Sequence, residues 1–423
     1  MYYIRSIRRL TGTPAGPALA VLAMGRRPKG AGRRRGVLLA VGAVVLVAGG
    51  GSVLAACTRP GAPARFGPIP GQVNAVASGP GGPAWAVGSS CTSCNSRSGF
   101  TRTLILRWDG TGWSRTPSPS PGFASLWGVS AGPGRAAWAV GTFHRRPGLI
   151  KALILRWDGA AWSQVPSPAP GAGSLLDAVT AGPGGTGWAV GRSCTACGTS
   201  SEIDKTLILR WDGAAWSQTP SPSPSRYSYL AGVSLGPGGT AWAVGSSCTA
   251  CGTSSEGFKT LILRWDGAAW SQVPSPSPGP DASLSEVSAG PGGIAWSVGF
   301  SLTGSLILRW DGRNWSRIRG PGTDTSLFAV SAGTGGTVWA VGSRPGAAPS
   351  RTLQTLIVRW NGTAWSQIPS PSHNADAVLS GVSAGPGGTA FAVGHSYTTA
   401  GFYSVRAFRT LILRWNGSTW SPG

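Results

Sequence analysis

The 423-residue chain is poor in charge, with 12% charged residues, and it contains only two methionines and three histidines. Long stretches of good helix formers are missing, while 67 glycines and 34 prolines disfavour helices throughout. These features exclude a helix bundle, and glycine is too rare and too irregularly spaced for collagen. Generic disorder is excluded because 41% hydrophobic residues, including 21 tryptophans, can bury a large core. The composition therefore favours short strands joined by many tight turns.

The chain also lacks the short motifs that mark common catalytic sites. It contains no HExxH or HxH spacing for a metal and no Walker loop for nucleotide phosphates. GxSxG occurs, for example at residues 128–132, but not in the strand-turn-helix setting of a serine hydrolase. We therefore expect neither a metal nor a cofactor. Carboxylate pairs for glycoside cleavage stay open, because they can come from distant loops.

The positive charge is spread rather than clustered. Nine of the 36 basic residues and none of the 13 acidic residues lie in residues 1–57, so the rest carries 27 bases against 13 acids. No run of four or more Lys or Arg occurs after residue 57. Specific nucleic-acid binding needs a clustered basic patch, so the sequence does not predict it. The spread charge predicts loose contact with anionic polymers instead.

The N-terminus is typical of an export signal. Arg33–Arg35 precede the uncharged residues 36–56, which end in Leu54-Ala55-Ala56-Cys57. This ending resembles the bacterial lipobox, which implies that Cys57 is the first mature residue and carries a lipid. The remainder is then anchored on the outer face of a bacterial cytoplasmic membrane. An uncleaved membrane span is the alternative, disfavoured by three consecutive glycines, and translation could start at Met1 or Met24.

One unit of 45 to 55 residues recurs seven times. Each copy contains a TLILRW-like segment followed by Asp-Gly or Asn-Gly, and a second Trp lies five residues after the first. The first Trp of each pair is Trp108, Trp157, Trp211, Trp265, Trp310, Trp360 and Trp415, and its partner is Trp113, Trp162, Trp216, Trp270, Trp315, Trp365 and Trp420. A WAVG-like segment, preceded by a Gly-Pro-Gly-Gly-like turn, starts at Trp85, Trp138, Trp188, Trp242, Trp296, Trp339 and Phe391. Trp127 alone is left over.

Each unit predicts four antiparallel strands joined by hairpin turns. Seven such units indicate an all-β fold, a seven-bladed β-propeller over residues 72–423. Tandem independent domains are the alternative, but fifty residues rarely bury enough core alone. We expect the paired Trp side chains to form the layers between blades. Residues 58–71 are predicted to be a tether, of which residues 65–70 help to close the seventh blade.

The unit resembles kelch repeats. WAVG stands where kelch repeats have a strand ending in Gly-Gly, and Trp265 and Trp270 stand at the places of their Tyr and Trp. The LILRW and WAVG array also resembles those of exported lipoproteins of actinobacteria. The resemblance covers residues 72–423 and implies a propeller fold. The copper chemistry of galactose oxidase, which has kelch-like blades, is not supported by the few tyrosines present.

Six cysteines form three CxxC pairs, each in the loop after a WAVG segment. They are Cys91 and Cys94, Cys194 and Cys197, and Cys248 and Cys251. Outside the cytoplasm such thiols are normally oxidised, so a disulfide within each loop is the leading interpretation. A Cys₄ zinc site between the third and fourth blades is the alternative.

The connections between strands predict one face with loops of constant length and one face with loops of variable length. Glycine-rich and Asp-Gly turns share the first, whereas the post-WAVG loops, five to fifteen residues long, and the Pro-Ser links share the second. Function on a repeated scaffold is normally carried by variable loops. The candidate ligand-binding residues are therefore Tyr227, Tyr229, His144, His373, His395, Tyr397, Phe402, Tyr403, Glu202 and Asp204, with Asp177 and Glu286 on first strands near the axis. We expect the scattered histidines to be solvent-exposed.

These observations predict a membrane-tethered, monomeric, non-catalytic binding or scaffold module for envelope glycan, peptide or protein. The alternative is an exported polysaccharide-acting hydrolase or lyase, whose acid and base would be chosen from Asp177, Glu286, Glu202 and Asp204. Passive association with the envelope through net charge is a third reading, and it predicts loss of binding at moderate salt.

Overall fold

The structure is a computed structural model that describes residues 69–79, 83–91, 101–132, 136–145, 149–168, 171–197, 199, 201–249, 251, 257–279, 281–320, 322, 324–346, 352–371, 376–400 and 404–423. The chain divides into two units, residues 1–62 and residues 63–423, and the second is described below. Cys57 and residues 58–68 lie outside the described residues. Among the described residues, no helix is long and apolar enough to cross a membrane.

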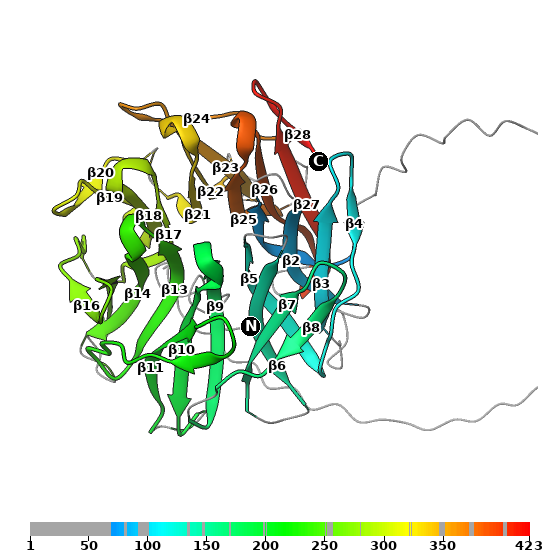
Figure 1. Ribbon diagram of the computed structural model, residues 1–423. Coiled ribbons are helices and arrows are strands. Elements are labelled where there is room, and N and C mark those ends of the chain that lie inside the picture. Colours follow the sequence, from blue (N-terminus) through cyan, green and yellow to red (C-terminus); the bar gives the residue numbers. More distant parts are fainter. Residues whose placement is uncertain are drawn as a thin grey trace, which may run out of the picture. The chain divides into compact units, whose positions relative to one another are not determined.

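The second unit is an all-β, seven-bladed propeller (Figure 1), as the repeats predict. Each blade is a four-stranded antiparallel sheet whose strands follow one another in chain order. Blades 1 to 4 comprise β1 (Gln72–Ser78), β2 (Ala84–Cys91), β3 (Thr101–Trp108), β4 (Trp113–Arg115); β5 (Phe123–Ala131), β6 (Ala137–His144), β7 (Lys151–Trp157), β8 (Trp162–Val165); β9 (Gly173–Ala181), β10 (Gly187–Thr195), β11 (Ile203–Trp211), β12 (Trp216–Gln218); and β13 (Ser228–Leu235), β14 (Ala241–Thr249), β15 (Gly257–Trp265), β16 (Trp270–Val273). Blades 5 to 7 comprise β17 (Ser283–Ala289), β18 (Ala295–Ser301), β19 (Gly304–Trp310), β20 (Trp315–Ile318); β21 (Ser326–Ala332), β22 (Val338–Pro345), β23 (Leu353–Trp360), β24 (Trp365–Gln367); and β25 (Asp376–Ala384), β26 (Ala390–Ala400), β27 (Ser404–Trp415), β28 (Trp420–Pro422).

Glycine-rich single turns connect the first two strands of blades 3 to 7. They are η2 (Pro183–Gly185), η3 (Pro237–Gly239), η4 (Pro291–Gly293), η5 (Thr334–Gly336) and η6 (Pro386–Gly388). In η3, Gly238 and Gly239 have φ of 67° and 77°, a region that residues with a Cβ rarely enter. The Asp-Gly turns rely on a different device, because the Asp109 carboxylate accepts hydrogen bonds from the backbone N–H groups of Thr111 and Gly112 at 2.8 and 2.9 Å.

Indole rings form the layers between blades, as predicted. Trp188 of β10 packs against the pair of the next blade, with ring centroids 4.9 Å from Trp265 and 5.1 Å from Trp270. The same three-ring contact recurs around the propeller, and Phe391 replaces the inserted Trp where blade 7 meets blade 1. Val73, Val393 and Phe391 share one buried cluster, so the first and last blades close the ring. All the buried clusters lie within residues 69–423, which therefore contain a complete core.

The arginine of each LILRW segment covers these indoles. The Arg210 guanidinium lies 5.6 Å from the Trp188 ring and 5.7 Å from the Trp265 ring. Equivalent cation–π contacts are made by Arg107, Arg156, Arg264, Arg309, Arg359 and Arg414. Seven of the basic residues that sequence reasoning treated as diffuse surface charge therefore stabilise the packing of the blades.

A β-bulge occurs at the same place in every innermost strand. The pairing with the second strand skips one residue, for example Ala231 between Leu230 and Gly232 in blade 4. The bulge brings the innermost backbone close to the WAVG glycine, so that a Cβ on Gly245 would lie 2.0 Å from the Tyr229 carbonyl oxygen. This close approach explains why the fourth position of WAVG is glycine in all seven blades.

Residues just before β1 pair with blade 7. Ile69 and Gly71 form backbone hydrogen bonds with Thr410 and Phe408 of β27, each 3.0 Å long, and the Ile69 N–H also donates to Thr410 Oγ1 at 3.0 Å. In blade 3 the corresponding Thr206 Oγ1 bonds instead to serines of the Pro-Ser link that follows the fourth strand. Ile69–Gly71 thus occupy in blade 7 the place that this link occupies in other blades.

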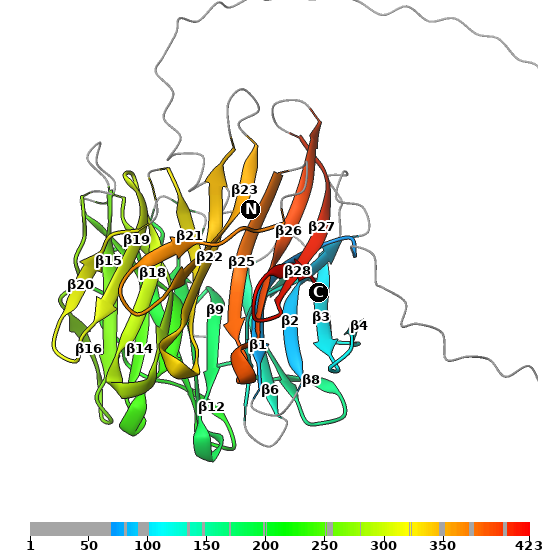
Figure 2. The same cartoon turned by 90° about the horizontal axis from the view of Figure 1, so that it is seen from above.

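The connections alternate between two faces of the propeller (Figure 2). We call the upper face the one that bears the ends of the second strands, the starts of the third strands and the links between blades. The glycine-rich and Asp-Gly turns lie on the opposite, lower face. Residues 395–409, expected to form a fifteen-residue loop, instead mostly continue β26 and β27 as a long hairpin.

Candidate functional site

The bulged residues of the innermost strands differ between blades. They are Asn74, Trp127, Asp177, Ala231, Ser285, Phe328 and Ser380. The preceding position, in contrast, is Leu in six blades and Val73 in blade 1. Six of the seven bulged residues are partly exposed although neighbouring blades cover both sides of their strands, so the exposure arises on the side of the propeller axis. We call these seven positions the axial ring.

Asp177 is the charged member of the axial ring. Burial raises the pKa of its carboxyl to about 6, and the nearby Arg192 guanidinium opposes this rise. The residue keeps some accessible surface, while protein atoms surround its carboxyl. Asp177 can therefore exchange a proton near neutral pH.

Arg192, whose charge acts on Asp177, contacts residues of blades 3 and 4. Its Nε lies 3.7 Å from Asp204 Oδ2, and its guanidinium lies 5.9 Å from the ring of Tyr229. Burial raises the pKa of Asp204, again opposed by Arg192. The other carboxylate oxygen, Asp204 Oδ1, is buried without a hydrogen-bond partner among the described residues. Asp204 lies in β11 rather than in a loop, contrary to the sequence-based expectation.

Cys194, Glu202 and Asp204 approach one another, with potential ligand atoms within 4.8 Å. Cys194 is disulfide-bonded to Cys197, so its sulfur is not a free thiolate. Arg192 also occupies the surroundings of Asp204, and this positive charge opposes a cation. The trio therefore lacks the donor set of a metal site.

Glu286 faces a neighbouring blade rather than Asp177. It follows the bulge of β17, a position held by Ala or Gly in the other six blades. Its Oε2 accepts a hydrogen bond from the backbone N–H of Val330 at 3.2 Å. Burial raises the pKa of this carboxyl to about 8. Because β13 stands between the strands of Asp177 and Glu286, the two acids do not form a single carboxylate pair.

The predicted aromatic candidates are packed together on strands instead of lining loops. His395 and Tyr397 lie in β26, and both contact Phe408, with ring centroids at 5.2 and 5.9 Å. Burial lowers the pKa of His395 to about 4, so this histidine is neutral at physiological pH and the expectation of solvent exposure is wrong for it. Burial and Asp376 together raise the pKa of Tyr397 to about 12.

The remaining candidates are similarly engaged. His144 ends β6 and stacks on Phe123 with ring centroids 4.8 Å apart. Tyr229 lies in β13 and contacts Phe258 at 5.9 Å, while Tyr227 lies 5.4 Å from the Arg226 guanidinium. His373, Phe402 and Tyr403 lie outside the described residues.

The cysteine pairs of blades 3 and 4 are disulfides, as predicted. Cys194 is bonded to Cys197 and Cys248 to Cys251, with Cα atoms 5.6 and 5.7 Å apart. Sulfurs bonded in this way are not available as thiolate ligands for a Cys₄ zinc site between these blades. Cys91 is also disulfide-bonded, and Cys94 lies outside the described residues.

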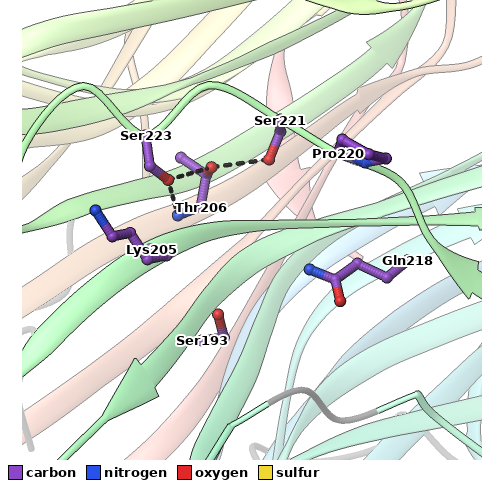
Figure 3. Close-up of a pocket in the computed structure, with 7 residues that line it drawn as sticks. All are labelled: Ser193, Lys205, Thr206, Gln218, Pro220, Ser221 and Ser223. Carbon is purple, nitrogen blue, oxygen red and sulfur yellow. Dashed lines mark hydrogen bonds between the residues drawn. The ribbon is translucent and has the colours of Figure 1, made fainter.

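A groove of about 590 Å³ lies on the outer side of blade 3 (Figure 3). Lys205 and Gln218 lie on opposite sides of it, and Thr206 bonds to Ser221 and Ser223 at 2.8 Å. The same Thr-to-link bonds occur at Thr103, Thr260 and Thr355 in other blades. The groove therefore belongs mainly to the repeated scaffold, whereas the axial ring is specific to each blade.

Sequence reasoning did not single out several residues of this region. Arg192, Phe328 and Asn74 were missed, and Trp127 was noted only as the tryptophan that the repeat does not explain. Trp127 lies in the axial ring, where its Nε1 is 3.5 Å from Thr142 Oγ1. Alignment of the seven copies position by position would have revealed this variable column, although not that it faces the axis.

No known family and no curated protein matches the chain. Among solved structures, a catalytically inactive virginiamycin B lyase from Staphylococcus aureus with quinupristin is similar, with 15% identity, a TM-score of 0.54 and coverage of 82% of this chain and 97% of that one. Pyrococcus horikoshii acylaminoacyl peptidase is 11% identical with a TM-score of 0.50; the match covers 84% of this chain but only 52% of the peptidase. YCF48 bound to D1 peptide shows 17% identity, a TM-score of 0.48 and coverage of 79% and 95%. At these identities the similarities show the propeller fold alone.

Proposed function

We propose that the protein is a non-catalytic binding module that holds a peptide or protein of the cell envelope at the upper, axial end of the propeller. The observation that carries this proposal is the axial ring, in which Trp127, Asp177 and Phe328 replace the small residues of other blades. Packing demands similar residues at equivalent positions of near-identical blades. Large or charged side chains that replace small ones at partly exposed positions therefore point to selection for a ligand.

The chemistry of the region suits a peptide. Trp127, Tyr229 and Phe328 offer apolar rings, while Asp177 and Arg192 offer one charge of each sign. Aromatic anchors beside fixed charges are typical of protein and peptide recognition. The lyase with quinupristin illustrates that a propeller of this fold accommodates such a ligand. Envelope glycan is the alternative ligand for the same aromatic rings.

The proposal includes the kelch-like character of the repeats, an origin among actinobacterial exported lipoproteins, and a monomer tethered by lipid on Cys57 to the outer face of the cytoplasmic membrane. The lipobox-like sequence supports the tether. Metabolic labelling with a radioactive fatty acid tests it, because the wild type should be labelled and Cys57→Ser should not. Labelling of both proteins would exclude Cys57 as the attachment site.

A double variant tests the axial site directly. Trp127→Ser and Phe328→Ser introduce the residue that blades 5 and 7 carry at the same position, so the fold should be retained. Cross-linking in intact cells should yield a partner with wild type and with the surface control Leu302→Ser, whose leucine is 52% exposed, and should lose it with the double variant. Equal cross-linking by all three proteins would overturn the axial site.

A polysaccharide hydrolase or lyase is the second candidate, favoured by the raised pKa of Asp177 near the axis. Activity on envelope polysaccharide that disappears in Asp177→Asn but persists in Asp281→Asn would support this candidate over the first. Asp281 is a matched control because its Oδ1 instead accepts a hydrogen bond from the backbone N–H of Phe258 at 3.3 Å.

A further inference from the structure

Exposed cations recur at one repeat position on the upper rim. The residue at the start of the third strand, directly before the Thr, Ser or Ala that precedes the apolar run, is Arg102, Lys151, Lys205, Lys259, Gly304, Gln354 and Arg409 in blades 1 to 7. All three lysines that follow residue 57 occupy this position. The five basic side chains are all exposed. We call them the basic crown.

Packing does not explain the crown. The LILRW arginines stack on indoles, and all seven blades keep them, whereas blades 5 and 6 form the same hairpin with Gly304 and Gln354 at the crown position. No crown side chain forms an ion pair with another described residue. Lys205 Nζ donates to the Ser225 carbonyl oxygen at 3.5 Å, and no acidic side chain neutralises any of the five charges among the described residues. The five charges are therefore available to an external anion.

The first described residues, Ile69 and Pro70, lie beside the crown. Pro70 pairs with Arg409, a crown residue, and the Ile69 N–H donates to the adjacent Thr410. Only residues 58–68 separate Ile69 from Cys57. At no more than about 3.6 Å per residue, this segment spans at most about 40 Å.

We propose that the basic crown docks the upper face of the propeller onto an anionic lipid bilayer. The crown spreads its charges over a ring of blades, which suits a flat, extended surface better than a short ligand. The proposal deepens the proposed function: it places the upper face, and hence the partner of the axial ring, at the membrane surface. A lipid on Cys57 would only keep the propeller close to the bilayer. The binding of the crown can therefore be tested with a protein that lacks the lipid.

Vesicle co-sedimentation of residues 63–423, which contain the complete core, is the test. Wild type should bind vesicles of phosphatidylglycerol and phosphatidylcholine in about equal amounts and not pure phosphatidylcholine. Each surface cation contributes about a fivefold gain in such binding, so the triple variant Lys151→Gln, Lys205→Gln, Lys259→Gln should bind roughly a hundredfold more weakly. Adding a sixth cation with Gln354→Lys should strengthen binding about fivefold.

The matched control removes the same charge elsewhere. Arg115, Arg313 and Arg317 are exposed and lie outside both the crown and the links between blades, and their triple replacement by Gln should retain most of the binding. Equal loss in both triple variants would overturn the proposal in favour of net charge. Binding of the crown to soluble polyphosphate in preference to vesicles at equal phosphate would overturn it in favour of an anionic polymer. Unchanged melting temperatures confirm that the variants are folded.

Discussion

The indoles of Trp188, Trp265 and Trp270 show how one type of residue joins adjacent blades. Trp188 lies between the paired rings of the next blade and is only 4% exposed. The Nε1 of Trp270 has no hydrogen-bond partner among the described residues, and neither has that of its six repeat equivalents. The apolar area and ring geometry, rather than a polar contact of the indole, therefore make the second Trp of each pair stabilising.

Substitution of Trp188 should separate the effect of area from that of ring shape. Trp188→Ala should lower the free energy of unfolding by about 3–5 kcal/mol, because it empties a buried layer. Trp188→Phe should cost about 1–2 kcal/mol, since Phe391 already fills the same place between blades 7 and 1. Urea unfolding provides the measurement, with the exposed Leu302→Ala as control. Equal losses in Ala and Phe variants would contradict the layer assignment.

Glu286 should make the protein less stable in mild alkali. Its pKa rises from 4.5 to about 8 on folding, so its stabilising contribution is fully present below pH 4.5 and is lost as the pH rises through 8. Glu286→Gln keeps an oxygen for the Val330 N–H and carries no charge. The melting temperature of wild type should therefore fall relative to that of the variant between pH 5 and 9. Parallel pH profiles would exclude a buried, protonated Glu286.

At the scale of the element, the bulge and the WAVG glycine depend on each other. The bulge turns the axial residue away from the regular alternation of the strand, and only glycine opposite it leaves room for the displaced carbonyl. A scaffold of near-identical hairpins thereby presents six types of side chain at seven equivalent positions around one axis. A serine further along the innermost strand binds the next blade. In blade 4, for example, Ser234 Oγ accepts a hydrogen bond from the Ala289 N–H of blade 5 at 3.0 Å.

Gly245→Ala tests this dependence. The added Cβ would lie 2.0 Å from the Tyr229 carbonyl oxygen and 2.8 Å from the Leu230 Cα, and both are backbone atoms that cannot swing away. We expect a loss of about 3 kcal/mol or more in stability. Gly112→Ala is the control, because a Cβ there meets nothing within 4 Å. Thermal unfolding of both variants is the measurement. A Gly245→Ala protein as stable as the control would contradict the close approach of Gly245 to the Tyr229 carbonyl oxygen.

At the scale of the molecule, the chain closes its ring with segments from both ends. Blade 7 is formed by residues 376–422, yet Ile69–Gly71 complete the outer side of β27. Its last strand, β28, ends at Pro422 and leaves the start of β27 to these N-terminal residues. Closure therefore joins parts of the sequence that are separated by more than three hundred residues.

Removal of the closing segment should destabilise blade 7. A chain of residues 72–423 lacks the hydrogen bonds of Ile69 and Gly71 and the packing of Ile69, so it should be about 1–3 kcal/mol less stable than residues 63–423. Differential scanning calorimetry of the two fragments makes the comparison. Thr410→Val in the longer fragment removes only the Oγ1 contact and should cause a smaller loss. Identical transitions for the two fragments would show that the segment is dispensable.

The sequence by itself determined the repeat count, the strand order and the layers of tryptophan. The repeat count and strand order are local features, because turn residues, Asp-Gly pairs and apolar runs act within a few residues of one another. The layers followed from the recurrence of the Trp pair in every copy. Only the tertiary structure decided that Trp127, Asp177 and Phe328 share an axis, that His395 is half-buried, and that the LILRW arginines cover indoles. These relations depend on the bulge and on closure of the ring, which bring together residues about fifty positions apart whose spacing carries no sign of contact.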